Sequence, residues 1–209
     1  MNLLARLRRW SRQPRSYKVL SVRYRLDGLH DALRERVTGL DLGGRAAVAD
    51  PGARLYMASH SRDMKRAIGE ALRHGPFDRF VDIGAGKGKA CLFAAGLGVF
   101  HEVVGVELSP DLVRVAEANA ANAGRPIRFL RADARTYDLP AGRTLVYLFN
   151  PFDADTLRAF LARNAAHFRE SRSVIAYVDD REAAELAAAG FEVLRRWDVP
   201  PVSVHRIGT

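Results

Sequence analysis

Residues 80–89, Phe-Val-Asp-Ile-Gly-Ala-Gly-Lys-Gly-Lys, indicate the fold of this chain more directly than any other segment. The first four of these residues predict a short buried strand, after which a glycine occupies every second position, at Gly84, Gly86 and Gly88. Glycines permit a tight turn and let a ligand approach the backbone closely. The helix predicted over residues 89–97 offers N–H groups at its start. This order of strand, glycine turn and helix predicts an α/β unit with a ligand-binding turn.

The rest of the chain alternates between predicted strands and helices. Strands are predicted at residues 80–83, 103–106, 127–130, 144–149, 173–178, 191–198 and 202–207. Helices are predicted at residues 61–74, 89–97, 110–123, 154–168 and 181–189. We therefore predict a Rossmann-like, doubly wound and mainly parallel seven-stranded α/β sheet with helices on both faces. Ligands of such sheets bind at the carboxyl ends of the strands.

The N-terminal region carries almost all of the excess charge. Of the net charge of +9, residues 1–25 contribute +8, because they hold eight basic and no acidic side chains. Amphipathic patterns at residues 1–13 and 26–37 predict a helical extension, and the Gly- and Ala-rich residues 40–53 predict a linker. We divide the chain into this extension, residues 1–53, and an α/β domain, residues 54–209. Residues 1–25 are expected to bind an acidic protein, an anionic lipid or nucleic acid; the alternative is that they form a solvated tail.

Several classes of protein are disfavoured by the composition. No apolar run approaches the roughly 18 to 20 residues that span a membrane, and no apolar segment of a secretory signal follows the basic start. The single cysteine, Cys91, has no partner for an internal disulfide, and its apolar neighbours predict a core position. The histidines are scattered without metal-ligand spacing. We therefore predict a cytoplasmic protein without a metal site.

Two carboxylates accompany the glycine turn. Asp82 lies two residues before Gly84, where its carboxylate can face a ligand, and Glu107 ends the next predicted strand. A carboxylate at the end of that strand accepts hydrogen bonds from both hydroxyls of a ribose. The G-x-G-x-G spacing differs from the G-x-G-x-x-G of dinucleotide binders. The combination predicts a nucleoside-containing cofactor other than a nicotinamide; an ordinary turn with a surface acid is the alternative.

On these residues the chain resembles the class I S-adenosylmethionine-dependent methyltransferases, over roughly residues 54–209. Residues 80–89 resemble their first motif, residues 103–107 the acidic motif, and residues 131–134 the segment that contacts adenine. The resemblance implies that S-adenosylmethionine is the cofactor, that Glu107 holds its ribose and that Asp133 holds its adenine edge. A simple turn residue is the alternative for Asp133. The implied cofactor-binding residues are Tyr56, Asp82, Gly84, Ala85, Gly86, Gly88, Glu107, Leu108, Asp133, Ala134 and Asn150.

The segment Asn150-Pro151-Phe152 leads to a prediction about the methyl acceptor, because it directly follows the predicted strand 144–149. An Asn amide oxygen and a nearby carbonyl hold an amine and aim its lone pair, so catalysis is mostly orientation. Proline fixes the turn, and the aromatic ring packs on the amine-bearing group. We predict these three residues as the catalytic ones; a mere strand end is the alternative.

This segment resembles the Asn-Pro-Pro-aromatic motif of amino-directed methyltransferases, although it has one proline instead of two. The Asn-Pro-Phe form with one proline is more similar to that of small bacterial relatives of the lysine-directed enzymes, which modify histones or the ATP-synthase c-subunit. The resemblance favours a protein lysine as the acceptor. It also implies that Tyr56 lies over the cofactor or substrate, because those relatives carry a Tyr-containing lid at residues 55–59; a core aromatic is the alternative.

The sequence is also compatible with other functions. The acceptor could be a nucleic-acid base or a small metabolite, and the domain could bind a cofactor or a partner without catalysis. Lys87 and Lys89 are expected to be solvated in preference to contacting the cofactor or a substrate. No general base stands out, so water is expected to take the proton of a lysine amine.

Overall fold

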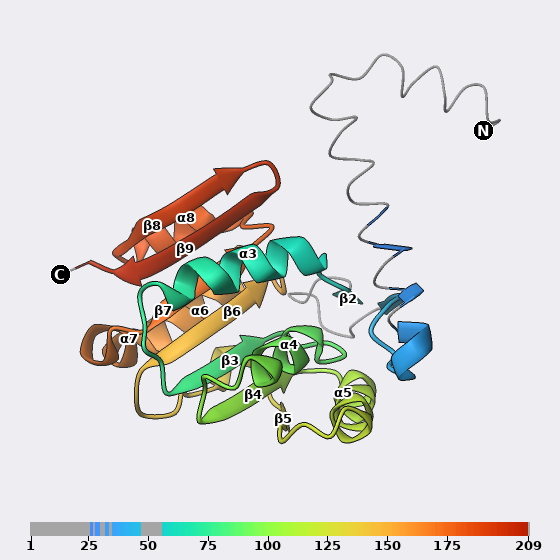
Figure 1. Ribbon diagram of the computed structural model, residues 1–209. Coiled ribbons are helices and arrows are strands. Elements are labelled where there is room, and N and C mark those ends of the chain that lie inside the picture. Colours follow the sequence, from blue (N-terminus) through green and yellow to red (C-terminus); the bar gives the residue numbers. More distant parts are fainter. Residues whose placement is uncertain (1–25, 27, 30–31, 34, 47–55, 209) are drawn as a thin grey trace, which may run out of the picture.

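The computed structural model describes residues 26, 28–29, 32–33, 35–46 and 56–208, and a seven-stranded sheet forms its centre (Figure 1). The strands are β3 (Arg79–Ile83), β4 (Glu102–Glu107), β5 (Arg128–Arg131), β6 (Thr144–Phe149), β7 (Val174–Val178), β8 (Phe191–Asp198) and β9 (Pro201–Ile207). Their order is β5-β4-β3-β6-β7-β9-β8. The strands from β5 to β7 pair in parallel, and β9 is antiparallel to both β7 and β8. The predicted Rossmann-like, mainly parallel seven-stranded sheet is confirmed, and its last two strands form an antiparallel hairpin.

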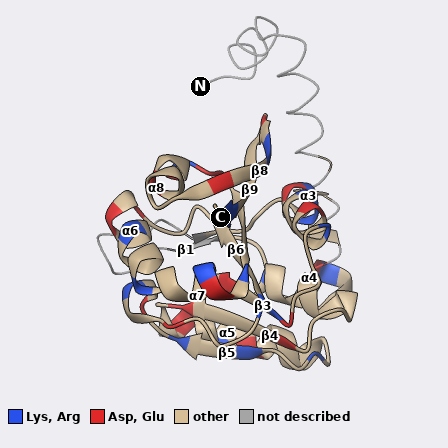
Figure 2. Ribbon diagram, turned by 90° about the vertical axis from the view of Figure 1, so that its left-hand side faces the viewer, with Lys and Arg blue, Asp and Glu red and all other residues tan. Residues whose placement is uncertain are grey.

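Helices cover both faces of the sheet (Figure 2). One face carries α3 (Ser61–Leu72), α4 (Lys89–Leu97) and α5 (Pro110–Asn122), and the other carries α6 (Ala154–Arg163), α7 (Ala165–Ser171) and α8 (Ala183–Ala188). Side chains alternate along each strand, so Phe80 packs in the core under α3 to α5 and Val81 in the core under α6 to α8. Burial on both sides explains why the central strands are almost continuously apolar.

The start of α5 follows its sequence signals. The Ser109 side chain accepts a hydrogen bond from Leu112 N, Pro110 occupies the first turn, and Asp111 adds a negative charge near the positive end of the helix dipole. This start fixes the loop between β4 and α5, which carries Glu107.

The helix predicted over residues 154–168 is wrong as a single element, because Asn164 divides it into α6 and α7. The Asn164 Nδ2 atom donates to the carbonyls of Tyr137 and Phe160, and its Oδ1 atom accepts from Leu139 N. One buried amide thereby satisfies backbone groups of two segments, and this compensates for the helix break.

The N-terminal part contributes a helical stretch and a small ribbon. Every described residue from 26 to 38 is helical, in line with the amphipathic pattern. The strand β1 (Arg45–Ala46) lies in the stretch predicted as a linker and pairs antiparallel with β2 (Tyr56–Met57), which lies beyond that stretch. The predictions for residues 1–25 lie outside the described residues. No helix in the described part of the chain is long and apolar enough to cross a membrane.

The topology places one edge of the sheet as the ligand-binding edge. From β3 the chain adds β4 and β5 on one side, and later β6 and β7 on the other, so the strand order reverses beside β3. Crevices at such reversals, outside the carboxyl ends of the strands, bind ligands in doubly wound folds. The residues that follow β3, β4, β6 and β7 therefore share this edge.

Candidate active site

The glycine turn joins β3 to α4 and is held against β4. The N–H groups of Gly84 and Ala85 both donate to the Val106 carbonyl, at 2.8 and 3.0 Å. Gly84 and Gly88 have φ values of 79° and 82°, which favour glycine over any residue with a side chain. A Cβ atom on Gly88 would lie 2.7 Å from the Phe129 ring. The turn thus requires glycine for its conformation and for its close packing.

Glu107, at the end of β4, connects its own loop to the glycine turn. Its Oε2 atom accepts from Gly86 N at 2.8 Å, and its Oε1 atom accepts from Ser109 N at 2.9 Å. The residue is 6% exposed. Because each carboxylate oxygen has a second lone pair, both oxygens remain able to accept a hydroxyl. Glu107 is therefore oriented by the backbone and retains the capacity to hold a ribose.

Asp82 lies at the end of β3 with only 3% of its surface exposed. Burial, followed by the negative charge of Glu107, raises the pKa of Asp82 to about 8, although a hydrogen bond from Cys91 opposes the shift. The Cys91 Sγ atom lies 3.8 Å from Asp82 Oδ2, and burial raises the pKa of this thiol well above its usual value. Cys91 is accordingly a core thiol, whereas Asp82 is a carboxyl that an incoming cation would ionise.

The adenine segment follows β5. Asp133 caps the 3₁₀ helix η1 (Ala134–Thr136) by accepting from Arg135 N, and its carboxylate also binds the Arg135 guanidinium through both oxygens. Chiefly because of the Arg135 hydrogen bond, the pKa of Asp133 is lowered. Ala134 and Leu108 are half-buried beside this edge. The predicted contact between Asp133 and adenine stays a prediction. The ion pair between Asp133 and Arg135 was not predicted from the sequence.

Asn150 and Pro151 occupy the turn after β6, beside the glycine turn. The Pro151 ring packs so closely on Gly84 that a Cβ atom there would overlap it. Asn150 is 8% exposed, adopts a φ of 38°, and donates from Nδ2 to Asp179 Oδ2 at 2.8 Å. Its Oδ1 atom is buried without a hydrogen-bond partner among the described residues. A buried acceptor of this kind, beside the glycine turn, is suited to bind a donor from a ligand.

Phe152 lies in a different environment from the one expected. Its ring is 5% exposed and belongs to the hydrophobic core under α6 to α8, together with Ile83, Leu148 and Leu157. The ring therefore anchors the turn in the core, and the predicted role beside the acceptor stays a prediction.

The segment before β1 is fastened to the glycine turn by Asn119 of α5. The Asn119 Oδ1 atom accepts from Asp41 N, and its Nδ2 atom donates to the carbonyls of Asp41 and Lys87. The Lys87 ammonium also binds Asp41 Oδ1 at 2.5 Å and the Gly43 carbonyl at 2.8 Å. We call this set of contacts the Asn119 latch. The expected solvation of Lys87 is wrong, because its ammonium serves the latch.

Two further predicted residues are Lys89 and Tyr56. Lys89 donates to the Ser59 carbonyl at 2.7 Å, so its ammonium is also engaged instead of solvated. Tyr56 belongs to β2, opposite Ala46. Asn119 and Asp179 were not among the predicted site residues. Asp179 directly follows the apolar strand β7, and an acid at the carboxyl end of a parallel strand is the sequence signal that would have indicated it.

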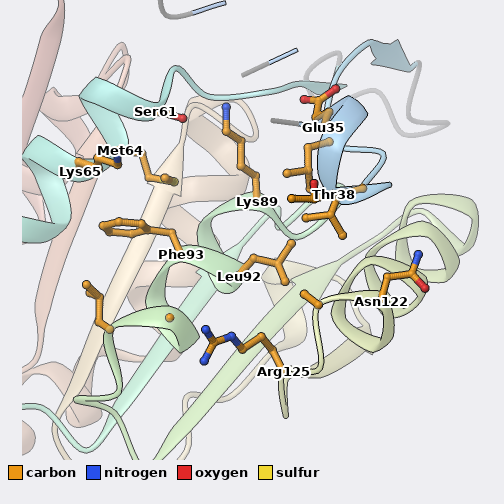
Figure 3. A pocket seen from close by; sticks show the side chains of 15 residues that line it. Glu35, Thr38, Ser61, Met64, Lys65, Lys89, Leu92, Phe93, Asn122 and Arg125 are labelled. Atoms are coloured by element: carbon orange, nitrogen blue, oxygen red, sulfur yellow. The ribbon is translucent and has the colours of Figure 1, made fainter. Parts of the chain in front are cut away.

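A separate cavity of about 580 Å³ lies along the outer side of α4 (Figure 3). Leu92 and Phe93 of α4, Met64 of α3 and Arg125 after α5 line it, together with helical residues 35 and 38. Asp82, Glu107 and Asn150 do not line it. It is therefore distinct from the ligand edge of the sheet. In the described part of the chain, no cluster of three His, Cys, Asp or Glu side chains could hold a metal ion.

Comparison with known families agrees with this geometry. Residues 80–171 match the model of a family described as a methyltransferase domain. This match, over less than half of the chain, includes the glycine turn, Glu107 and Asn150. The demethylmenaquinone methyltransferase of Thermus thermophilus is 31% identical over 147 residues, which make up 70% of this chain and 59% of that protein. The chain thus spans less than two thirds of the length of this relative.

Solved structures share the fold of the α/β domain. An S-adenosylmethionine-dependent methyltransferase from Clostridium acetobutylicum superposes with a TM-score of 0.58 at 12% identity, covering 71% of this chain and 92% of that one. A ribosomal protein L11 methylase from Lactobacillus delbrueckii subsp. bulgaricus gives a TM-score of 0.55 at 17% identity, covering 73% and 82%. The chain therefore shares the fold of these two proteins.

Proposed function

We propose that the methyltransferase domain transfers a methyl group from S-adenosylmethionine to an amine nitrogen, with a protein lysine as the favoured acceptor. The observation that carries the proposal is Asn150, whose buried Oδ1 atom has no partner in the described part of the chain. It lies next to Pro151, which packs on Gly84 of the glycine turn. An amide oxygen there accepts the N–H of an amine and orients its lone pair.

The residues around the turn fit the cofactor. Glu107 has a lone pair on each oxygen for the ribose hydroxyls, and the buried Asp82 supplies a carboxyl that a cationic ligand stabilises in its charged form. When bound, S-adenosylmethionine supplies an electrophilic methyl group on its sulfonium. The Asn150 turn would hold the deprotonated amine so that its nitrogen lone pair faces this methyl group; the N–C bond would form as the S–C bond breaks, and the electron pair of the S–C bond would stay on sulfur. Before the transfer, water would take the proton of the lysine ammonium.

Two measurements test the proposal. Calorimetric titration of the full chain with S-adenosylmethionine tests the cofactor, and absence of binding at millimolar concentration would refute the proposed function. Transfer of a radiolabelled methyl group to host proteins, compared with host nucleic acids, tests the acceptor. Asn150→Ala should lower turnover far more than cofactor affinity, whereas Asn122→Ala, an exposed amide on α5, should change neither. Labelled nucleic acid in place of protein would instead support a base as the acceptor.

One finding supports a second class of acceptor as the alternative. The Thermus thermophilus relative is a demethylmenaquinone methyltransferase, so a quinone-like small molecule is the alternative. The same labelling experiment distinguishes the two, because label would then appear in an organic extract of host lipids instead of in protein. Label in neither fraction, despite cofactor binding, would favour a non-catalytic binding module.

We further propose that the N-terminal extension docks on anionic lipid. Leu26, Leu29, Leu33 and Val37 recur at helical spacing and are 59–77% exposed, and residues 1–25 add a charge of +8. An exposed apolar stripe beside a basic segment fits the interface of an anionic membrane. Co-sedimentation with phosphatidylglycerol vesicles should be strong, should fall with phosphatidylcholine vesicles and should be lost on Leu29→Asp. Binding to RNA that is unaffected by Leu29→Asp, without binding to vesicles, would favour nucleic acid instead.

A further inference from the structure

Asn150 and Asp179 form a bonded pair at the ligand edge of the sheet. Their strands, β6 and β7, are parallel neighbours, and Phe149 is in register with Val178, so the two residues are the next positions along. Both have left-handed backbones, with φ values of 38° and 51°. Only three non-glycine residues in the described part of the chain have positive φ, so two of the three lie side by side here. Unfavourable backbone conformations of this kind concentrate at functional sites.

Asp179 is itself held from two further directions. Its N–H donates to the Pro201 carbonyl at 2.8 Å, and its carboxylate lies 3.1 Å from the Nε atom of Arg181. An ionised carboxylate only accepts hydrogen bonds, so its contact with Asn150 must come from the amide NH₂ group. This chemistry decides which way the Asn150 amide is turned. Nδ2 is committed to Asp179, and Oδ1 is the atom that remains to accept a ligand donor.

We propose that Asp179 is a positioning residue of the methyl-acceptor site, which it makes selective for amines. This proposal rests on the function proposed above, and in it Asp179 has two effects. It fixes the Asn150 amide so that an oxygen, and not an NH₂ group, meets the acceptor, and this selects a group that donates N–H. Its carboxylate, which the Arg181 guanidinium neutralises only in part, also disfavours an anionic acceptor such as a phenolate relative to a neutral amine.

The test uses two cofactor analogues, so it does not depend on knowing the acceptor. S-adenosylhomocysteine lacks the methyl group, and sinefungin carries a cationic amine in its place. If Asn150 Oδ1 accepts an amine, the full-length protein should bind sinefungin about tenfold more tightly than S-adenosylhomocysteine, the preference expected for one hydrogen bond to a charged donor. Isothermal calorimetry measures both dissociation constants, and the preference is their ratio.

Variants of the pair separate positioning from simple structural support. Asp179→Ala should reduce the preference to within about twofold of unity, because the Asn150 amide is then able to turn over. Asp179→Asn, which keeps an acceptor but removes the charge, should give an intermediate preference. The exchange variant Asn150→Asp/Asp179→Asn should restore the preference, since the pair is rebuilt with the roles reversed. Arg181→Ala, which removes the other side-chain partner of Asp179, serves as the matched control and should keep the preference.

The outcomes distinguish the inference from the function on which it rests. If Asp179→Ala weakens both analogues equally and keeps the preference, Asp179 is merely structural and the inference is wrong. If the wild-type protein prefers sinefungin but the exchange variant does not regain that preference, the positioning role is also refuted. If the wild-type protein binds neither analogue, the proposed function fails first. Should Asp179→Ala not fold, Asp179→Asn and the exchange variant decide the matter.

Discussion

Gly84 and Pro151 are in such close contact that the glycine turn and the Asn150 turn form a single unit. A Cβ atom on Gly84 would overlap the Pro151 Cβ atom and lie 3.4 Å from its Cγ atom. The contact joins the turn after β3 to the turn after β6, on opposite sides of the point where the strand order reverses. A displacement of one turn therefore moves the other.

Gly84→Ala should consequently lower both stability and cofactor affinity. The methyl group meets Pro151, and a φ of 79° is unfavourable for alanine, so we expect a loss of about 2–4 kcal/mol in the free energy of unfolding. Urea denaturation measures this loss, and calorimetry measures the affinity. Gly69→Ala is the control, because nothing lies within 4 Å of its added Cβ atom inside α3. It should stabilise the protein by about 0.5–1 kcal/mol. Equal behaviour of the two variants would contradict the contact.

Glu107→Gln should weaken cofactor binding by at least tenfold. The carboxylate accepts from Gly86 N and Ser109 N, and a glutamine amide would present its NH₂ group to one of these donors. The loss of one charge-assisted hydrogen bond, about 1.5–3 kcal/mol, corresponds to that factor or more. Calorimetric titration with S-adenosylmethionine checks the result, with Glu117→Gln, an exposed acid on α5, as the control. An unchanged affinity in Glu107→Gln would argue against the ribose role.

The fold was predictable because its signals are local. Alternating apolar stretches fixed the strands, and Ser109-Pro110 marked the start of α5. The division of residues 154–168 was not predictable, because Asn164 acts through distant backbone groups, at Tyr137 and Leu139. An asparagine inside a helical pattern carries no local sign of such partners.

The site was predictable in its chemistry but not in its connections. Residues 82–88 and Glu107 follow from spacing along the chain, whereas Asn119 and Asp179 act across 78 and 29 positions. Long-range pairs of this kind depend on which strands and helices become neighbours, and a single sequence does not specify that. The division at residue 53 stays a prediction, although Asp41, on the extension side of it, already contacts α5.

Asn119→Ala should open the latch between α5 and residues 41–43. The substitution removes hydrogen bonds to Asp41 N, Asp41 O and Lys87 O, and leaves some of these partly buried groups unsatisfied. We expect the free energy of unfolding to fall by about 2–3 kcal/mol and cofactor affinity to fall several-fold. Amide hydrogen exchange should rise in residues 40–44, and Asn122→Ala on the same helix should leave it unchanged. Unaltered exchange in Asn119→Ala would show that other contacts hold this segment.

Asp82 gives the protein a pH dependence that one variant should isolate. Burial and the Glu107 charge raise the pKa of Asp82 to about 8 in the folded state, against about 3.9 for an unfolded aspartate. Between these values the folded state binds more protons than the unfolded one. The contribution of Asp82 to stability is thus fully present below about pH 4 and is lost as pH rises to about 8.

The slope from this one group is at most about 1.4 kcal/mol per pH unit. In Asp82→Asn the buried charge never forms. From pH 5 to pH 8 the unfolding free energy of the wild type should therefore fall relative to that of the variant. Urea denaturation at several pH values measures this difference, and Asp155→Asn, an exposed acid on α6, should show no such shift. A difference that stays constant over this range would mean that Asp82 is already ionised in the folded protein.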